Sequence, residues 1–526
     1  MNDNDIAPLL ASLPARLGGL LRRQAHSIPH ARALHDGHQY WTYARLAAAV
    51  DHTAALLRAL GVRPGDRLMV VGENCVAQVA LTFAAADIDA WIVHVNGRLT
   101  AHEVDQIRDH CGARRAIYAS APGGALSPET AAHGARHGAC TADSPFGPWM
   151  IGALNDDCAP EPVHAAAAQQ VAALVYTTGT TSTAGAPKGV MLSHRNLLFI
   201  AAVSSTLRGL TPQDRAWGVL PITHVYGMTS VMLGTLCAGA CLYLCPRFTP
   251  DALLHALHDH RLTIVQGVPA MYARLLEKLG DAHAPLPNQL RFAYAGGSPL
   301  APGLKARVER LLGVPLHNGY GLTETAPTVS QTRLDRPRDD SSVGQVIPGV
   351  EARVVDAEGA DAATVAAAGA QGELWVRGPN VMLGYYRAPA LTGAAMRPGG
   401  WFNTGDIVRR DADGALFIVG RTRELIIRSG FNVYPLEIET ALNAHPGVTQ
   451  SAVVGRPGRN GADEEDVIAY IEADARHSAT VAALHAYLAE RLAPYKRPAE
   501  IIVMAALPAA ATGKILKGRL RALAAG

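Results

Sequence analysis

Several features are scarce in this 526-residue chain, and each excludes a class of protein. The formal net charge is only +2 and no long basic run occurs, so a nucleic-acid partner held by bulk electrostatics is not expected. The acidic start, Met-Asn-Asp-Asn-Asp, has no basic segment followed by an apolar core, so we expect no secretory signal. The 7 cysteines form no C-x-x-C pair, which fits reduced thiols in a cytoplasmic protein.

Two local patterns have competing interpretations. Cys237, Cys241 and Cys245 recur every fourth residue, which suggests either a metal site or buried small apolar side chains, and we favour the second. Residues 225–245 contain no Asp, Glu, Lys or Arg and are long enough to span a bilayer. Glycines interrupt this stretch, and it divides into a buried helix at 228–238 and a buried strand at 240–245. We therefore expect a soluble core and no stable membrane span.

The order of apolar segments predicts an α/β fold with more than one domain. Buried strands at 67–71 and 90–95 alternate with amphipathic helices such as 43–60 and 75–86, which is typical of βαβ units in a mainly parallel sheet. Thr100-Ala101-His102-Glu103 is a capping-box pattern that predicts the start of another helix. Residues 119–166, rich in Ala, Gly, Pro and Asp, are expected to form a connection that consists mostly of loops.

The last third of the chain changes character. Short strands with Gly-containing turns predict a smaller β-rich subdomain at about 343–420, with an alanine-rich exposed insertion at 360–370. A boundary follows, and the remaining residues repeat a small α/β pattern that is long enough for a separate domain. We therefore predict a large, layered N-terminal domain at 1–420, a hinge at 421–424 and a small, mobile C-terminal lid at 425–526.

One hydroxyl-rich stretch lies between two apolar strands. Residues 176–194 read YTTGTTSTAGAPKGVMLSH, with five Thr, one Ser and three Gly before the second apolar step begins at Val190. Glycines allow the backbone to approach a ligand closely, successive amides can form an anion-binding concavity, and Lys188 adds a positive charge. The spacing is not that of a P-loop. The two interpretations are a polyphosphate-binding loop and a flexible surface loop.

Four further stretches carry more chemistry than a fold requires. AGGSP at 295–299 follows a strand, so its backbone can approach a flat ligand, and NGYGLTET at 318–325 combines glycines, an aromatic, a hydroxyl and a carboxylate that can hold Mg²⁺. WFNTGD at 401–406 presents an acid after a tight turn, where it could accept hydrogen bonds from ribose hydroxyls. PAAATGKI at 508–515 presents Lys514 on a small turn near the C-terminus.

With these motifs in this order, the sequence resembles the adenylate-forming superfamily of acyl-CoA synthetases, aryl-acid and peptide-synthetase adenylation domains, and luciferases. The motifs run from about Trp41 to Lys514, nearly the whole chain. The resemblance implies a large N-terminal domain with a small lid. It also implies a two-step reaction, in which a carboxylate attacks the α-phosphate of ATP and a thiol, usually that of coenzyme A, then attacks the acyl-adenylate. The first step needs no general base, because a carboxylic acid is ionised at pH 7.

The resemblance assigns roles residue by residue. Lys188, Lys514, Glu324 and His224 would form the catalytic set, with Glu324 binding Mg²⁺, Arg423 at the hinge and Gly430 bordering the coenzyme A channel. The residues that would bind ATP or AMP are Thr178, Gly179, Thr180, Thr181, Lys188, Gly297, Ser298, Asn318, Tyr320, Gly321, Thr323, Asp406 and Arg421. The residues that would line the acyl pocket are Val225, Tyr226, Met228, Val268, Met271, Ala295 and Gly296.

Some of these assignments leave alternatives open. His224 would lie between the nucleotide and acyl pockets, but a core histidine is an equal alternative, and Gly430 could be only a turn glycine. Ser182-Thr183-Ala184 make the phosphate loop three residues longer than in relatives. The apolar acyl pocket suits a medium-chain fatty or aryl acid. Arg274 could bind a second carboxylate, as in malonate-activating relatives, although we favour a solvated helix arginine.

The predicted enzyme is an AMP-forming acyl-CoA synthetase that uses ATP, Mg²⁺ and coenzyme A on a small-molecule carboxylic acid. One alternative is an adenylating enzyme that loads a carrier protein, or an oxidative luciferase-like relative. Another is a nucleotide-binding protein without catalysis, which the retention of Lys188 and Lys514 disfavours. A homodimer remains open, and the sequence names neither the acid nor the pathway.

Overall fold

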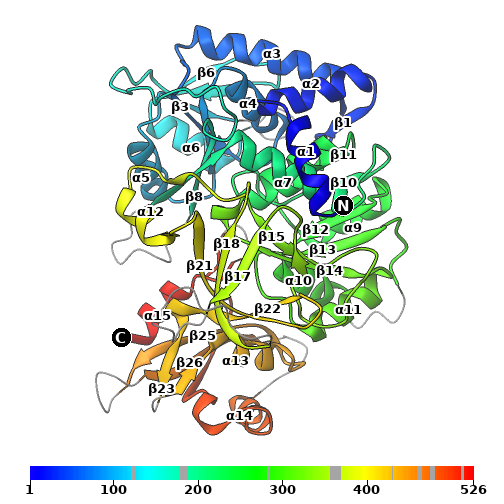
Figure 1. The fold of residues 1–526 in the computed structure, drawn as a ribbon, viewed down its shortest axis with the longest axis vertical. Helices are drawn as coiled ribbons and strands as arrows, with labels where there is room; N and C mark the ends of the chain where they lie inside the picture. Colours follow the sequence, from blue (N-terminus) through cyan, green and yellow to red (C-terminus); the bar gives the residue numbers. More distant parts are fainter. Residues whose placement is uncertain are drawn as a thin grey trace.

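The chain folds into a large upper part and a small lower part (Figure 1). The computed structural model describes residues 1–119, 126–177, 187–280, 285–355, 369–428, 431–458, 465–473, 480–510 and 514–525. Parallel strands with helices on both faces make up most of the upper part, and the lower part has its own small sheet. The predicted α/β class, a large N-terminal domain with a small C-terminal one, is confirmed.

The first sheet carries the phosphate-loop strands near one edge. Its strand order is β19-β9-β8-β4-β3-β5-β7-β6. The central strands β3, β4, β5 and β8 run parallel, as the alternating strands and helices predicted, whereas β8 and β9 form an antiparallel pair around the hydroxyl-rich stretch. The strands are β3 (Arg67–Gly72), β4 (Trp91–Asn96), β5 (Arg115–Tyr118), β6 (Cys140–Ala142), β7 (Trp149–Ile151), β8 (Val171–Thr177), β9 (Lys188–Ser193) and β19 (Gly384–Tyr385).

The second sheet carries the other N-terminal motifs at the ends of its strands. Its order is β16-β15-β14-β13-β12-β10-β11-β1-β2, with parallel pairing from β1 through β11, β10, β12 and β13 to β14. The strands are β1 (Arg32–His35), β2 (Tyr40–Thr42), β10 (Arg215–Gly218), β11 (Cys241–Leu244), β12 (Ile264–Gly267), β13 (Phe292–Ala295), β14 (Leu316–Gly321), β15 (Thr328–Gln331) and β16 (Gln345–Val346). Because parallel strands end at one edge, the loops after β12, β13 and β14 lie together.

Helices pack on both sheets, and the most apolar of them lie in the core. The capping box predicted at Thr100 is present at the start of α5. The helices of the upper part are α1 (Ile6–Ser12), α2 (Leu17–Ser27), α3 (Tyr43–Ala59), α4 (Val76–Asp87), α5 (Ala101–Cys111), α6 (Pro128–Arg136), α7 (His194–Leu207), α8 (Gly234–Cys237), α9 (Pro250–Asp259), α10 (Pro269–Leu279), α11 (Pro302–Leu312) and α12 (Pro389–Ala395).

The uncharged segment at 225–245 lies in the core. It forms the π-helix η2 (Tyr226–Leu233), the short helix α8 and the strand β11. Every residue of η2 is buried, and the helix packs against α7. The predicted split into helix and strand is therefore correct, although the helix begins two residues earlier than expected and starts as a π-helix. In the part of the chain that the structure describes, no helix is both long enough and apolar enough to cross a bilayer.

The connection at 119–166 contains a helix that the sequence analysis missed. Helix α6 begins at Pro128, and the hydroxyl of Ser127 accepts a hydrogen bond from the Thr130 amide. A Ser N-cap followed by proline at the first helical position is a typical helix start. The surrounding Ala, Gly and Asp residues obscured this local signal.

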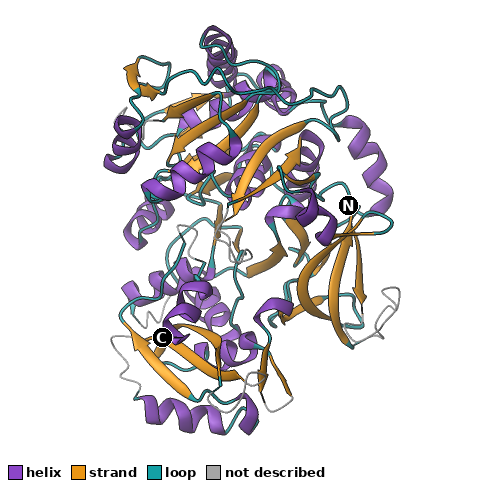
Figure 2. Ribbon diagram, turned by 90° about the vertical axis from the view of Figure 1, so that its left-hand side faces the viewer, coloured by secondary structure: helices purple, strands orange, loops and turns teal. Residues whose placement is uncertain are grey.

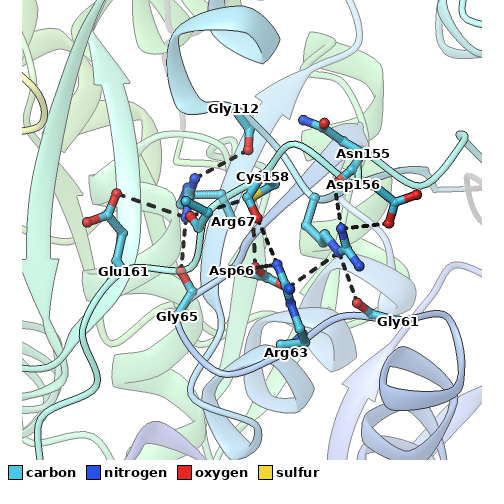
Figure 3. Close-up of polar contacts among 12 residues, drawn as sticks. Gly61, Arg63, Gly65, Asp66, Arg67, Gly112, Asn155, Asp156, Cys158 and Glu161 are labelled. Carbon is cyan, nitrogen blue, oxygen red and sulfur yellow. Dashed lines mark hydrogen bonds and ion pairs between the residues drawn. The ribbon is translucent and has the colours of Figure 1, made fainter.

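A buried polar network fixes the end of the same connection against the turn before β3 (Figure 3). The carboxylate of Asp66 accepts hydrogen bonds from the Arg63 guanidinium at 3.1 Å, and Arg67 donates to the carbonyl oxygens of Gly65 and Ala159. Asp66 and Arg67 are both fully buried. Because buried charges are stable only when paired, these contacts explain why a segment rich in loop residues is well defined here.

A third sheet leads from the upper part to the lower one. It contains β17 (Glu351–Val355), β18 (Gln371–Arg377), β20 (Met396–Arg397), β21 (Trp401–Arg410) and β22 (Leu416–Arg421), all paired antiparallel. This sheet corresponds to the predicted β-rich subdomain. Most of the alanine-rich insertion predicted at 360–370 lies outside the described residues.

The strands and helices of the lower part lie together below the upper part (Figure 2), and they have their own apolar clusters. Its elements are β23 (Ile426–Arg428), β24 (Phe431–Val433), α13 (Pro435–Asn443), β25 (Val448–Pro457), β26 (Glu465–Ala473), α14 (Val481–Ala489), β27 (Glu500–Met504) and α15 (Lys517–Ala525). The turn η4 (Thr422–Glu424) joins it to the third sheet. The exact boundaries at 420 and 425, and the mobility of the lid, stay predictions.

Candidate active site

The predicted site residues converge on one large cavity between the upper and lower parts. The cavity has a volume of about 2190 Å³. It is bordered by the carboxyl ends of β12, β13 and β14, by β9, by the third sheet and by the C-terminal turn that carries Lys514. The predicted residues that line it are Lys188, His224, Val225, Tyr226, Val268, Met271, Ala295, Gly296, Gly297, Ser298, Asn318, Tyr320, Gly321, Thr323, Glu324, Asp406, Arg421, Arg423 and Lys514.

An acid–arginine–tyrosine group forms one wall. Asp406 on β21 is buried, and one of its carboxylate oxygens accepts a hydrogen bond from the Tyr320 hydroxyl. Its other oxygen lies 2.7 Å from Nε of Arg421. Burial and the Asp406 charge raise the pKa of Tyr320 well above its ordinary value, so the phenol stays protonated. This group offers fixed acceptors beside an aromatic face, which suits a ribose and its base.

A carboxylate and a lysine lie beside a second tyrosine of the cavity, Tyr385. The Tyr385 hydroxyl donates a hydrogen bond to Oε1 of Glu324 at 2.8 Å. Nζ of Lys188 lies 4.9 Å from the centre of the Tyr385 ring. Burial, followed by the nearby Arg423 charge, lowers the pKa of Lys188, and Glu324 opposes this shift. A buried cation here attracts phosphate oxygens strongly, because little water screens it.

Lys514 lines the cavity next to an antiparallel bridge between Ala509 and Ile515. The Ala510 amide donates to the Lys514 carbonyl at 2.8 Å, and the Leu516 amide donates to the Pro508 carbonyl at 2.7 Å. The surrounding protein and the Arg421 charge lower the pKa of Lys514, whereas Glu424, Asp406 and Glu324 oppose this. The Lys514 residue remains exposed to solvent within the cavity. Lys514 therefore lies near both Asp406 and Glu324, the two carboxylates predicted to bind the ribose and Mg²⁺.

His224 lies at the point where the charged region meets the apolar one. Its Nδ1 accepts a hydrogen bond from the Tyr226 amide at 3.2 Å. Burial, together with the Lys514 charge, lowers the pKa of His224 to about 4. The ring is therefore neutral at pH 7. The sequence left open whether His224 is a pocket residue or a core histidine. Its position fits both, because it lines the cavity and is also shielded by the surrounding protein.

The apolar region of the cavity is built from η2, β13 and the start of α10. Gly296 forms a flat wall here, because a Cβ at this position would lie 3.1 Å from Cε1 of Tyr226. Gly321 is constrained more severely, since its Cβ would lie 1.7 Å from the Pro327 carbonyl oxygen. Among the described residues, Met228 is buried in η2 but does not line the cavity.

Two family models match most of the chain. The family of AMP-binding enzymes matches residues 21–386, and the C-terminal domain of AMP-binding enzymes matches residues 437–514. The chain belongs to this family. A feruloyl-CoA synthase from Amycolatopsis sp. is 34% identical over 507 residues, covering 96% of this chain and 98% of the relative. A 2-succinylbenzoate–CoA ligase from Geobacillus kaustophilus is 33% identical over 511 residues, covering 96% of this chain and 97% of the relative.

Solved structures give the same result. ATP-bound MatB from Rhodopseudomonas palustris is 30% identical, with a TM-score of 0.82, and the match covers 96% of this chain and 98% of that one. MenE from Bacillus subtilis, solved with ATP and a magnesium ion, is 28% identical with a TM-score of 0.78, covering 95% and 98%. The resemblance drawn from the motifs is confirmed, and so is the enzyme class, an AMP-forming acid–CoA ligase.

The charged side chains that line the cavity of this AMP-binding enzyme are suited to bind ATP and Mg²⁺. Three cations, Lys188, Lys514 and Arg421, line the cavity and can neutralise phosphate charge. Glu324 has one oxygen engaged by Tyr385 and a second that can bind Mg²⁺, which prefers carboxylate ligands. The contacts with Tyr320 and Arg421 fix the orientation of the Asp406 carboxylate, as its predicted role at a ribose would require.

Some expected residues lie outside the described part of the AMP-binding enzyme. They are Thr178, Gly179, Thr180 and Thr181 of the phosphate loop, the three additional residues 182–184, and Gly430 of the coenzyme A channel. Their roles stay predictions. The flanking residues are described, and Thr177 pairs with Lys188 at the base of the β8–β9 hairpin.

The sequence analysis did not predict two residues that line the cavity, Tyr385 and Arg208. Tyr385 lies far along the chain from Lys188 and Glu324, and only the pairing of β19 with β9 brings it to them. The Gly384-Tyr385-Tyr386 triplet was the one available signal. Arg208 lines the cavity from the residue after α7, where an arginine following an apolar helix reads as an ordinary helix end.

Proposed function

We propose that this AMP-binding enzyme activates an aryl carboxylic acid with ATP and transfers the acyl group to coenzyme A. One observation carries the proposal: Lys188, Glu324, Asp406 and Lys514 border one cavity whose other end is apolar. Oppositely charged groups at one end suit a nucleotide, and apolar walls with a flat glycine suit an aromatic ring.

In the first step, an oxygen of the acid's carboxylate attacks the α-phosphorus of ATP, and the bond to the β-phosphate oxygen breaks to release pyrophosphate. The acid is already ionised, so the protein's task is to position the reactants and to neutralise charge. Lys514 would contact the reacting carboxylate and phosphate, and Lys188 the phosphates that leave. Mg²⁺, when bound by Glu324, would screen the phosphate oxygens further.

In the second step, the sulfur of coenzyme A attacks the acyl carbon and the bond to the AMP oxygen breaks. The thiol proton is lost, and the products are a thioester and AMP. His224 is neutral at pH 7, because its pKa is about 4. Since its Nδ1 accepts a hydrogen bond from the Tyr226 amide, Nε2 carries the proton and can donate a hydrogen bond beside the acyl group. The lid would turn about Arg423 between the two steps.

The identity of the acid is inferred from the relatives and from the pocket. Relatives that match nearly the whole chain are named as feruloyl-CoA synthase, 2-succinylbenzoate–CoA ligase and indoleacetate–CoA ligase. Tyr226, Val268 and Ala295 surround the apolar end of the cavity and are buried. These observations favour an aryl acid over a medium-chain fatty acid.

The test is a two-stage assay over a panel of aryl and straight-chain acids. Acid-dependent exchange of pyrophosphate into ATP reports the first step, and release of AMP with and without coenzyme A reports the second. We expect exchange with an aryl acid and a stoichiometric thioester once coenzyme A is added. An adenylate that accumulates without ever forming a thioester would contradict transfer to coenzyme A and favour a carrier-protein acceptor.

A further inference from the structure

Two arginines line the cavity near its apolar end, and they differ in their partners. Arg274 on α10 has two carboxylates, Glu277 at 3.0 Å and Glu472 at 2.8 Å. Arg208 has none among the described residues, although it is only 3% exposed. Arg274 is therefore already neutralised, whereas among the described residues no carboxylate compensates the charge of Arg208 in the wall of the cavity.

The partners of Arg208 are all neutral. Nη1 donates to Oε1 of Gln266 at 2.6 Å, and Nη2 donates to Oε1 of Gln331 at 3.2 Å. The guanidinium also lies over the Tyr294 ring, 4.3 Å from its centre. These contacts hold the side chain in one orientation. They leave Nε without a partner among the described residues, and Nη2 carries a second hydrogen.

Three buried polar groups around this arginine lack a described partner. They are Nε of Arg208, the Tyr226 hydroxyl and Nε2 of Gln266. Buried polar groups are nearly always hydrogen-bonded, because leaving one unsatisfied destabilises the folded state. Burial raises the pKa of Tyr226 to about 12, with Arg208 opposing the shift, so this hydroxyl keeps its proton and can donate. All three groups are therefore donors, and the missing partner is an acceptor.

Tyr226 connects this group to the acyl pocket. A Cβ on Gly296 would lie 3.4 Å from the Tyr226 hydroxyl oxygen, so this hydroxyl borders the flat glycine wall. Arg208, Tyr226 and Tyr294 all line the cavity. A ligand group that reaches the wall beside Gly296 from the apolar end would meet a cation and uncharged donors.

We infer that the activated acid carries a second carboxylate at its far end, which Arg208 binds together with the Tyr226 hydroxyl and the Gln266 amide. A carboxylate accepts several hydrogen bonds and matches the fork of a guanidinium in both geometry and charge. The second carboxylate would compensate the positive charge of Arg208, since Tyr226 and Gln266 are uncharged. The inference rests on the proposed function, because it names the class of acid that the same pocket takes, and it makes Arg208 a specificity-determining residue.

The test compares acids that share one ring and differ at its far end. Cinnamic acid, 4-hydroxycinnamic acid and 4-carboxycinnamic acid are assayed for kcat/KM in AMP release with coenzyme A. We expect the wild-type enzyme to favour the 4-carboxy acid over cinnamic acid by roughly 100-fold, since truncating one side of a buried charge contact has an effect of this size. Equal values for the three acids, or a preference for the 4-hydroxy acid, would overturn the second carboxylate.

Variants assign the preference to this group of residues. Arg208→Met should abolish the preference for the 4-carboxy acid, and Tyr226→Phe should reduce it about 10-fold while removing only an oxygen without a described partner. Arg274→Met is the matched control, because that arginine lines the same cavity but is already paired, and it should leave the ratio unchanged. A ratio that persists in both Arg208→Met and Tyr226→Phe would also overturn the inference.

A binding measurement separates this inference from the proposed function. Without ATP, 4-carboxycinnamic acid should raise the Tm of the wild-type enzyme more than cinnamic acid does, and the Tyr226→Phe variant should lose most of this difference. Such a shift without AMP release from any acid would contradict the proposed reaction but support the carboxylate site. AMP release with all three acids, together with equal Tm shifts, would support the reaction and contradict the site.

Discussion

Lys514 is the residue on which we expect the two half-reactions to differ most. It reaches the cavity from the C-terminal part, whereas Lys188 belongs to the N-terminal part. Lys514→Ala should slow acid-dependent pyrophosphate exchange by about 100- to 1000-fold, the usual effect of removing one charge-stabilising donor. Thioester formation from pre-made acyl-adenylate, followed by rapid quench, should change only a few-fold if, as proposed, the lid turns and presents other residues in that step.

The matched control is Lys278→Ala, which removes a lysine paired with Asp251 on the surface and away from the cavity. It should leave both half-reactions unchanged. If Lys514→Ala slowed both half-reactions equally while keeping the wild-type Tm, the two-conformation mechanism would be wrong.

Tyr385 should tune the metal site without contributing a ligand. Tyr385→Phe removes the hydrogen bond to Oε1 of Glu324 but keeps the ring beneath Lys188. Groups that orient a metal ligand typically change metal affinity 10- to 100-fold. The Mg²⁺ concentration for half-maximal pyrophosphate exchange should therefore rise about 10-fold. Tyr386→Phe, whose hydroxyl donates to Glu161 instead, should not change it, and an unaltered Mg²⁺ dependence in Tyr385→Phe would contradict this role.

At the scale of elements, one ion pair joins α10 of the upper part to β26 of the lower part. Arg274 donates to Glu472 at 2.8 Å, and the other oxygen of Glu472 accepts the Leu507 amide at 2.6 Å. The buried carboxylate thus links α10 to the segment that leads to the Lys514 turn. The contact is present in the arrangement in which Lys514 lines the cavity, so we expect it to favour this arrangement.

Weakening this contact should affect the first half-reaction alone. The Arg274 side chain is 41% exposed, so the pair contributes about 0.5–1 kcal/mol, and Arg274→Ala should slow pyrophosphate exchange about 2- to 5-fold. Thioester formation from pre-made adenylate should not slow. Arg377→Ala, which breaks a pair with Glu351 within the third sheet, is the control. A slower thioester step in Arg274→Ala would show that the contact does not favour one lid orientation.

The elements themselves were largely predictable because local patterns specify them. The apolar run at 67–71 became β3, and the capping box at Thr100 starts α5. The π-helical start of η2 was not predictable, because helical periodicity does not distinguish a π-helix from an α-helix. Helix α6 was missed because its cap, Ser127-Pro128, lies in a stretch whose composition is typical of loops.

At the scale of the whole molecule, buried neutral histidines make stability depend on pH. Burial lowers the pKa of His94 and His194 to about 3, and of His224 and His317 to about 4. In the unfolded chain each would titrate near its ordinary value of about 6.5, so below that pH the unfolded state binds more protons. Stability is therefore present above pH 6.5 and is lost as the pH falls towards 4.

Urea unfolding at pH 7, 6 and 5 measures this dependence. Each such histidine contributes up to about 1.4 kcal/mol per pH unit to the decrease in unfolding free energy, in a range mostly above carboxylate titration. His258→Gln, at an exposed position on α9, should leave the slope unchanged. An unfolding free energy that stays constant or rises between pH 7 and pH 5 would contradict the buried neutral state.

The sequence alone determined the family, the order of the motifs and the identity of the charged groups, because short motifs such as GYGLTE fix local backbone and chemistry together. It therefore identified Lys188, Glu324, Asp406 and Lys514 without any coordinates. Tertiary structure alone decided which residues meet. Tyr385 reaches Glu324 through strand pairing, Arg274 is neutralised by Glu472 from the other part of the molecule, and Arg208 is buried with neutral partners. Such contacts depend on long-range packing, and a charge's partner across the fold leaves no local pattern in the chain.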